Sequence, residues 1–280
     1  MPGMRILWQS FQDPGEHRGY LEALRGYLDE IADAGTTFDI AGMVPPDRFL
    51  HRLTELRCGI TALRNAVYAE RAGYDAVVIG HFQEPGLYDM RACVDLPVVG
   101  LGESALRHAC MLGQRIGLVT KDPVFYSFHE EQVARYGLTD RVVGVTAVAI
   151  PPDSLLAART DEAAHARVLE LFEAGAQPLL EAKADVLIPA GALPSMGVGA
   201  ARDVTVGGAR VVEAVAVAAK TAEGLVRIGR ISGVAPSRRS TFEKPSAAAM
   251  EEFISATGGE LSPPIGFEST AVARKRGPHD

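Results

Sequence analysis

Short runs rich in valine and isoleucine alternate along the chain with longer segments whose apolar residues recur at helical spacing. Such alternation is typical of strand and helix units repeated around a mostly parallel sheet, so it predicts an α/β fold. Strands are expected at Arg5–Trp8, Phe38–Met43, Ala76–Ile79, Val98–Val99, Arg115–Thr120, Val142–Ala149, Val186–Ile188 and Val204–Val206. Helices are expected at Arg18–Ala34, Pro46–Ala72, Glu103–Leu112, Pro123–Tyr136, Thr160–Ala182 and Ala209–Ile228.

The length of 280 residues exceeds one typical domain, and a hydrophobic share of 47% is enough for more than one core. We therefore expect two domains. From Gly229 onward, serine, proline, glycine and basic residues dominate, except for a helical stretch near Ala247–Ala256. Residues Ala273–Asp280 contain almost nothing to bury, which predicts disorder there.

The charge and the cysteine content restrict the classes of partner and the cellular compartment that we expect. A net charge of −7 disfavours binding to nucleic acid or to an anionic membrane surface. Because no apolar run reaches the roughly 20 residues that span a bilayer and no signal peptide is apparent, we expect the cytoplasm. Three cysteines at wide spacing, Cys58, Cys93 and Cys110, suit neither a disulfide framework nor a zinc knuckle, and the histidines fall singly. No metal site is expected.

Two stretches of the chain, Ala72–His81 and Ala182–Gly191, read alike. In each of them an aspartate starts a buried strand, and the sixth residue after it, His81 or Gly191, lies just past the carboxyl end of that strand. Open α/β sheets place ligands at these ends. The repeat therefore predicts two equivalent loops that face one site, although any two strand and helix units could show this much similarity.

Several motifs identify a resemblance to a known family. Val78–Leu87 followed by Asp95–Ala105 resembles the first catalytic loop of hydantoin racemases and the strand and glycine turn after it. Gly117–Thr120, Tyr136–Leu138 and Ser232–Pro245 are similar to later segments of the same family. The resemblance to the aspartate/glutamate/hydantoin racemase superfamily thus covers nearly the whole chain. It implies two pseudo-symmetric flavodoxin-like domains, the first formed by residues 1–100 together with 207–280 and the second by residues 101–206. It also implies an active site in the cleft between them and catalysis without a cofactor.

The resemblance also implies where the catalytic groups lie. In that family one cysteine from each domain flanks the substrate's α-carbon, so that one thiolate removes a proton and the opposite thiol returns one. The first cysteine falls on His81 and the second on Gly191, so both thiols are replaced. An imidazole, with an unperturbed pKa of ~6.5, can still transfer a proton at neutral pH. Gly191 offers only backbone amides and space, which favours one-sided chemistry over symmetric two-base racemisation.

Further candidates lie near the same strand ends. Glu84, three residues after His81, is expected either to orient the imidazole, to act as a second acid/base group, or to be a solvated loop carboxylate. Gln9 follows the first strand, where the family has a segment that helps to bind substrate carbonyls. Thr120 and Lys121 carry donors that can hold a carboxylate or imide oxygen. The other substrate-binding candidates are Ser10, Phe82, Tyr126, Ala190, Ala192 and Ser195.

A competing pattern suggests a dinucleotide site. Val98–Ala105 reads as a strand, Gly-x-Gly-x-x-Ala and a helix, and Asp122 follows about twenty residues later. Glu103 at the helix start would repel a pyrophosphate, however, and the family resemblance accounts for the same glycines. We therefore expect no cofactor. The serine-hydrolase elbow, the zinc-protease helix and the phosphate-binding loop are also absent from the sequence.

Taken together, the sequence predicts an isomerase-like enzyme that transfers a proton next to a carbonyl of a small hydantoin-, imide- or carboxylate-type substrate. A hydrolase, a decarboxylase or a lyase that uses His81 on one side of the substrate is an alternative. A non-catalytic protein that binds a small molecule is another. Enzymes of this kind often pair, so the chain can form a homo-oligomer.

Overall fold

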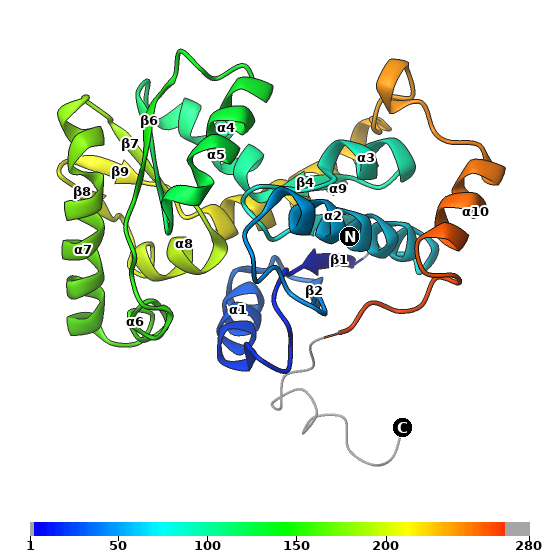
Figure 1. The fold of residues 1–280 in the computed structure, drawn as a ribbon, viewed down its shortest axis with the longest axis horizontal. Helices are drawn as coiled ribbons and strands as arrows, with labels where there is room; N and C mark the ends of the chain where they lie inside the picture. Colours follow the sequence, from blue (N-terminus) through cyan, green and yellow to red (C-terminus); the bar gives the residue numbers. More distant parts are fainter. Residues whose placement is uncertain (1–2, 267–280) are drawn as a thin grey trace. The chain divides into compact units, whose positions relative to one another are not determined.

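The computed structural model describes residues 3–266, so the tail Ala273–Asp280 lies outside the described residues. The described chain forms two compact units. The first contains residues 3–80, 85–99 and 219–266, and the second contains residues 81–84 and 100–218. Each unit surrounds its own sheet with helices (Figure 1), which confirms the predicted α/β fold.

The sheet of the first unit has the strand order β2-β1-β3-β4. Strand β1 pairs in parallel with both β2 and β3, as expected when helices connect the strands. These four strands are β1 (Met4–Gln9), β2 (Thr36–Ala41), β3 (Ala76–Ile79) and β4 (Val98–Gly100). The helices of this unit are α1 (Arg18–Ile31), α2 (Arg52–Arg71), α3 (Leu87–Cys93), most of α9 (Ala214–Ser232), the short η2 (Ser240–Phe242) and α10 (Ala247–Ala256).

Local sequence explains how these elements form. All four residues of β3 are buried, which fits its uninterrupted apolar run. Helix α1 buries Tyr20, Leu21, Leu24 and Leu28, whose spacing of three and four residues makes one apolar face. Helix α2 begins after His51 rather than at the expected Pro46, because the His51 side chain accepts the Leu53 N–H and caps the first turn. Helix α10 lies beside α2, and Arg64 of α2 donates to the carbonyl of Ile254 (Figure 1).

The sheet of the second unit has the order β6-β5-β7-β9-β8. Strand β5 pairs in parallel with β6 and β7, β7 pairs in parallel with β9, and only β8 runs antiparallel to its neighbour among these pairs. The strands are β5 (Ile116–Thr120), β6 (Val142–Ala147), β7 (Val186–Pro189), β8 (Thr205–Val206) and β9 (Ala209–Val211). The helices are α4 (Leu101–Leu112), η1 (Pro123–Phe125), α5 (Tyr126–Arg135), α6 (Pro152–Ala157), α7 (Glu162–Glu181) and α8 (Ala192–Val198).

The structure corrects the expected helix that begins at Ala209. Residues Ala209–Val211 form β9, because the Gly207–Gly208 turn, with positive φ at both glycines, returns the chain to the edge of β7. Helix α9 therefore begins only at Ala214. Residues 207–218 consequently belong to the second unit, whereas the sequence prediction placed the return to the first domain at residue 207. The short helices α3, α6 and α8 were not expected.

The predicted internal repeat has a structural counterpart in each unit. Asp75 accepts the backbone N–H of Arg5 at the start of β1, and Asp185 accepts that of Arg115 at the start of β5. At the other end of the two strand pairs, Gly80 donates its N–H to Gln9 and Ala190 donates its N–H to Val119, each at 2.8 Å. The loops that begin at His81 and Gly191 therefore follow equivalent strand ends, that of β3 in the first unit and that of β7 in the second.

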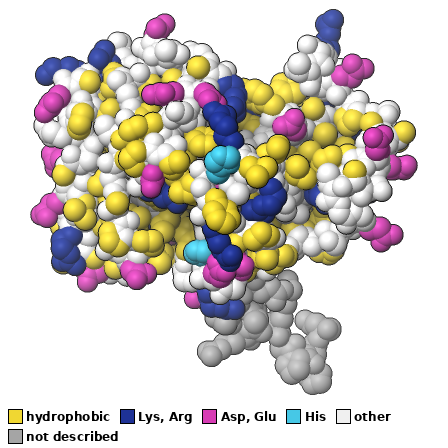
Figure 2. Space-filling view, viewed as in Figure 1, with side chains coloured by type: hydrophobic (Ala, Val, Ile, Leu, Met, Phe, Trp, Pro, Cys, Tyr) yellow, Lys and Arg dark blue, Asp and Glu magenta, His cyan; other side chains and the backbone are white. Residues whose placement is uncertain are grey.

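The surface carries charges of both signs. On the face shown in Figure 2, basic and acidic side chains are interspersed among apolar ones, consistent with the modest net charge of −7. Within residues 3–266, none of the helices combines the length and the apolar character needed to cross a bilayer.

The close contact between Gly80 and Trp8 gives a test of the fold next to His81. A Cβ at residue 80 would lie 2.1 Å from the Trp8 Nε1 atom, and the Trp8 side chain is fully buried and has no room to move. We expect Gly80→Ala to lower the free energy of unfolding by about 1–3 kcal/mol in a urea titration. The matched control is Gly26→Ala in the exposed middle of α1, where nothing lies within 4 Å. That change should raise the free energy of unfolding by roughly 0.5–1 kcal/mol. Equal effects of the two substitutions would contradict the close packing of Gly80 against Trp8.

Candidate functional site

His81 stands two residues after the last residue of β3 and is partly buried. The two side chains on its C-terminal side that point inward, Phe82 and Glu84, are each only 1% exposed. Glu84 adopts a positive φ of 57°, a conformation that costs energy for a residue with a side chain. The loop is therefore held in a defined shape by buried contacts rather than left free at the strand end.

Glu84 is neither solvated nor exposed, because three donors surround its carboxyl group. The backbone N–H of Glu103 donates to Oε1 at 2.7 Å, and Nε2 of Gln132 donates to Oε2 at 2.8 Å. The hydroxyl of Tyr136 donates a third, short hydrogen bond to Oε2. All three donors belong to α4 or to α5 and its C-cap. Glu84 thus attaches the His81 loop to two helices of the second unit.

Burial dominates the electrostatics of this carboxyl group. Removal from water raises the pKa of Glu84 to about 7, although the hydrogen bonds from Tyr136, Glu103 and Gln132 act in the opposite direction. Burial and the facing carboxylate also raise the pKa of the Tyr136 phenol, so that group stays protonated and donates. Glu84, three residues after His81, therefore changes its protonation state near neutral pH.

The glycines of the dinucleotide-like motif have a packing role. A Cβ at Gly102 would lie 2.5 Å from both Gln132 Nε2 and the Phe82 carbonyl oxygen, so the close approach of the loop requires glycine. The first turn of α4, where a bound pyrophosphate would sit in a dinucleotide-binding fold, already donates to the Glu84 carboxylate. This arrangement gives the motif a structural explanation that does not involve a nucleotide.

His129 is a buried histidine beside the loop that sequence reasoning did not select. Its ring is 0% exposed and contacts Phe82 edge-on, with 5.3 Å between the ring centroids. Burial lowers the pKa of His129 to about 4, with the hydrogen bond to Gln132 acting in the opposite direction and His81 in the same one, so the ring is neutral at pH 7. A single histidine on a helix gave no signal in the sequence, because its neighbour Phe82 is 47 residues away along the chain.

The loop at Gly191 differs sharply from the loop at His81. Gly191 has a φ of 157°, and a Cβ there would lie 3.1 Å from the Pro194 ring, so a side chain would be strained. Its N–H donates to the Pro189 carbonyl, and that of Ala190 donates to Val119. These two amides are therefore engaged in holding the turn. The N–H of Ala192, the first residue of α8, precedes the first hydrogen bond within that helix.

Ser195, expected to bind substrate, has a structural role in the second unit. Its hydroxyl donates to Glu213 Oε1 at 2.9 Å and accepts the Ala214 N–H at 2.5 Å. Glu213 in turn accepts the N–H groups of Val215 and Ala216. Ser195 and Glu213 therefore cap the start of α9 together, and the fully buried serine has its hydrogen-bonding capacity in use.

Gln9 and Ser10 are also buried within their own unit. Gln9 Nε2 donates to the carbonyls of Ser10 and Gly42, and its Oε1 accepts from Asn65 at 2.6 Å. The amide that was expected to bind a substrate carbonyl is thus already satisfied. Ser10 is 1% exposed, and its hydroxyl bonds to the buried phenol of Tyr20.

The end of β5 provides a different kind of group. The hydroxyl oxygen of Thr120 is buried, at 2% exposure for the residue, and lacks a hydrogen-bond partner within the described residues. Lys121 is exposed, with its Nζ 5.6 Å from the centroid of the Phe125 ring, and Tyr126 is partly buried at the start of α5. Because buried hydroxyls normally find a partner, the unpartnered hydroxyl of Thr120 is an unsatisfied polar group at this strand end.

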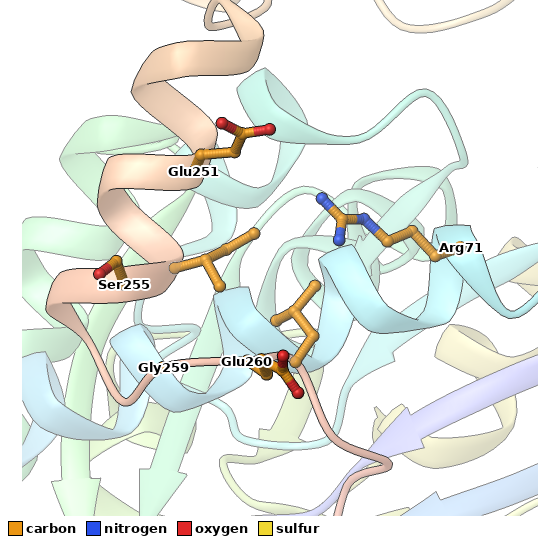
Figure 3. Close-up of a pocket in the computed structure, with 7 residues that line it drawn as sticks. Arg71, Glu251, Ser255, Gly259 and Glu260 are labelled. Carbon is orange, nitrogen blue, oxygen red and sulfur yellow. The ribbon is translucent and has the colours of Figure 1, made fainter.

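A cavity in the first unit does not involve any of these residues. It encloses about 550 Å³ and is lined by Arg71, Glu251, Ile254, Ser255, Gly259, Glu260 and Leu261. Figure 3 shows Arg71 at the end of α2 and Glu251 on α10, on opposite sides of this hollow. Its walls lack a buried acid/base group, so the cavity is a weaker candidate for a catalytic site than the His81 loop. No cluster of three metal-ligating residues occurs in the described chain.

Comparison with known proteins gives a consistent assignment. Residues 46–222 match the family model described as Asp/Glu/Hydantoin racemase. A hydantoin racemase of Pseudomonas sp. (strain NS671) is 40% identical over 76 residues, which cover 27% of this chain and 30% of that protein. A hydantoin racemase of Rhizobium meliloti is 31% identical over 100 residues, which cover 36% of this chain and 40% of that protein. The similar part thus spans less than half the length of either relative.

Two solved structures resemble the fold. Allantoin racemase from Klebsiella pneumoniae has a TM-score of 0.70 at 20% identity, covering 87% of this chain and 94% of its own. Allantoin racemase from Pseudomonas fluorescens has a TM-score of 0.68 at 24% identity, covering 86% and 97%. At these identities the likeness shows the fold alone, and it confirms the mostly parallel α/β architecture.

The raised pKa of Glu84 predicts a pH dependence of stability. A carboxyl group with a pKa of about 7 in the folded protein and about 4.5 when unfolded stabilises the fold fully below pH 4.5, and this contribution is lost as the pH rises toward 7. The loss should be on the order of 3 kcal/mol, since one pKa unit corresponds to about 1.4 kcal/mol. Glu84→Gln should remove this slope in urea titrations between pH 4.5 and 7.5. Glu170→Gln, at an exposed carboxyl group on α7, should keep the slope of the parent protein.

The role of Ser195 can be tested with a matched pair of variants. Ser195→Ala removes the hydroxyl that accepts the Ala214 N–H and donates to Glu213, so the free energy of unfolding should fall by about 1–3 kcal/mol. Ser127→Ala, at an exposed position on α5, should leave it unchanged within roughly 0.5 kcal/mol. A stable Ser195→Ala protein with weakened substrate binding would instead support the sequence expectation that Ser195 contacts substrate.

Proposed function

Because the chain belongs to the Asp/Glu/hydantoin racemase family, we propose that it is an isomerase-like enzyme in which His81 transfers a proton at a carbon next to a carbonyl. The observation that carries this proposal is the setting of His81. It is a partly buried titratable side chain just past the carboxyl end of β3, on a loop whose next residues are anchored by buried hydrogen bonds. Open α/β sheets bind ligands at such strand ends.

The chemistry requires one group that takes and returns a proton. An unprotonated nitrogen of His81 removes the proton from carbon, and the electron pair of the broken C–H bond moves into the adjacent carbonyl to form an enolate. Return of the proton from the imidazolium to the same face restores the original configuration. Delivery of a proton from water to the opposite face inverts it, and the hydroxide that this leaves takes the proton of the imidazolium, which regenerates water and the neutral imidazole. The buried, unpartnered hydroxyl of Thr120 is the donor we assign to the enolate oxygen.

The substrate class follows from the relatives. Hydantoin and allantoin, which the relatives named above racemise according to their names, are cyclic ureides whose exchangeable carbon lies beside a ring carbonyl. We propose a small hydantoin-type ring as the preferred substrate, with cyclic imides and carboxylic acids as the neighbouring classes. The apolar or uncharged candidates Phe82, Ala190 and Ala192 suit a neutral ring better than a highly charged ligand.

A second candidate function is one-sided lyase, decarboxylase or hydrolase chemistry. It is favoured by the composition of the Gly191 loop, in which Ala190, Gly191 and Ala192 carry no titratable side chain and the hydroxyl of Ser195 is engaged with Glu213. A second acid facing the substrate is needed for two-base inversion, whereas loss of carbon dioxide or addition of water requires one proton-transferring group and an oxyanion donor.

Proton NMR in heavy water separates these functions. The protein is incubated with single enantiomers of 5-substituted hydantoins, cyclic imides and substituted malonates. Deuterium uptake with inversion indicates a racemase, loss of carbon dioxide a decarboxylase, and a ring-opened product a hydrolase. We expect deuterium uptake with the hydantoins, and we expect His81→Ala to lower its rate by about 100-fold or more.

Two controls make the result specific. His81→Gln retains a polar side chain without acid/base capacity and should be as impaired as His81→Ala. His108→Gln, at a partly buried histidine of α4, should keep the parent rate. Full activity of His81→Ala would rule out His81 as the proton-transferring group, and binding without any turnover would favour the binding-protein alternative.

A further inference from the structure

One side-chain amide holds the surroundings of His81 together. Gln132 of α5 is 1% exposed, and its Nε2 donates to the Phe82 carbonyl at 2.6 Å and to Glu84 Oε2 at 2.8 Å. Both hydrogens of the amide are therefore used on the residues that follow His81. The carbonyl of Gln132 then faces the other way, 3.3 Å from Nδ1 of His129.

These contacts fix the orientation of the Gln132 amide and, through it, the tautomer of His129. Because two acceptors face Nε2, the Gln132 oxygen must face His129, and an oxygen can only accept. Nδ1 of His129 therefore carries the hydrogen. In the neutral ring this leaves Nε2 unprotonated, and that atom is buried without a hydrogen-bond partner in the described part of the chain. The ring is confined by Phe82 and Phe125, whose centroids lie 5.3 Å and 6.1 Å away.

We propose that Gln132 is a positioning residue for His81: its amide fixes the backbone that follows His81 and holds His129 as the Nδ1–H tautomer beside the same loop. This inference rests on the proposed function, because positioning matters only if His81 transfers the proton. Gln132 does not touch the reacting atoms. It acts through Phe82, Glu84 and His129, all of which belong to the same unit.

No neighbouring group can replace the Gln132 amide. Gly102 leaves the space that Gln132 and the Phe82 carbonyl occupy, and a Cβ there would lie 2.5 Å from each. The groups that face Glu84 are otherwise Tyr136 and Glu103, with Arg107 paired to Glu103 and stacked over the Tyr136 ring. The side-chain hydrogen bond to the Phe82 carbonyl comes from Gln132. Loss of Gln132 would thus free the backbone directly after His81 while leaving Glu84 with two donors.

The first test is Gln132→Leu in the full chain, with the hydantoin exchange reaction as readout. Misplacement of His81 should lower kcat by about 10- to 100-fold, because small displacements of a catalytic group have effects of this size. KM should change by less than about threefold, because Gln132 does not contact substrate. The matched control is Gln177→Leu, at an exposed glutamine of α7, which should keep both constants.

A pair of carboxyl variants tests the geometry even if the leucine variant folds poorly. In Gln132→Glu, two carboxyl groups face each other and can share one proton, so activity should persist at acid pH and collapse as that proton leaves. The exchanged double variant, Glu84→Gln with Gln132→Glu, again places one amide against one carboxylate. In this double variant, activity should no longer collapse at high pH, although the Phe82 carbonyl still lacks the Gln132 donor. A purely structural role for Gln132 does not predict this reversal of the pH profile.

Long-range proton–nitrogen correlation NMR of the histidine rings reports their tautomers and is independent of activity. The parent protein should show His129 as the neutral Nδ1–H tautomer. In Gln132→Leu, the signal of that tautomer should weaken, because Nδ1 no longer has the Gln132 oxygen as its acceptor. If His81→Ala is inactive while Gln132→Leu keeps the parent kcat and the parent His129 signal, the inference is overturned. If His81→Ala is fully active, the proposed function fails, and the His129 signal still decides the positioning geometry on its own.

Discussion

The buried carboxyl group of Glu84 is the interaction on which the candidate site depends. A carboxyl group removed from water is costly unless donors surround it, and here Tyr136, Gln132 and the backbone N–H of Glu103 do so. Because Glu84 lies only three residues after His81, this cage fixes the loop at close range. It also accounts for the strained positive φ at Glu84, which persists because the surrounding hydrogen bonds determine it.

The two units present equivalent strand ends with opposite chemistry. Asp75 and Asp185 accept backbone N–H groups at the start of the neighbouring strand in the same way, and the loops follow at the same distance along the chain. One loop then carries an imidazole, and the other carries a glycine whose backbone conformation disfavours any side chain. In a family defined by proton transfer, this asymmetry concentrates acid/base capacity on one loop. It is the physical reason to consider one-sided reactions together with racemisation.

The sequence predicted the fold wherever local patterns decide it. Buried β-branched runs such as Ala76–Ile79 form strands as expected, because few other structures bury four consecutive apolar residues. Ala209–Val211 was predicted to be helical because it leads into an alanine-rich helix, and pairing with β7 and β8 makes it a strand. Glu84 could not be assigned locally, since its donors Gln132 and Tyr136 lie 48 and 52 residues away. The same distance in sequence concealed His129.

The surroundings of His81 are arranged so that buried charge stays low near neutral pH. Burial shifts the pKa of Glu84 upward to about 7 and that of His129 downward to about 4, and both shifts favour the uncharged form. A neutral His129 and a largely protonated Glu84 below pH 7 leave few fixed charges beside the loop. The electrostatic environment of His81 therefore depends on the state of Glu84, whose ionisation adds a negative charge three residues away. The Gln132 amide donates both to this carboxyl group and to the Phe82 carbonyl, so one side chain links the group that ionises to the backbone directly after His81.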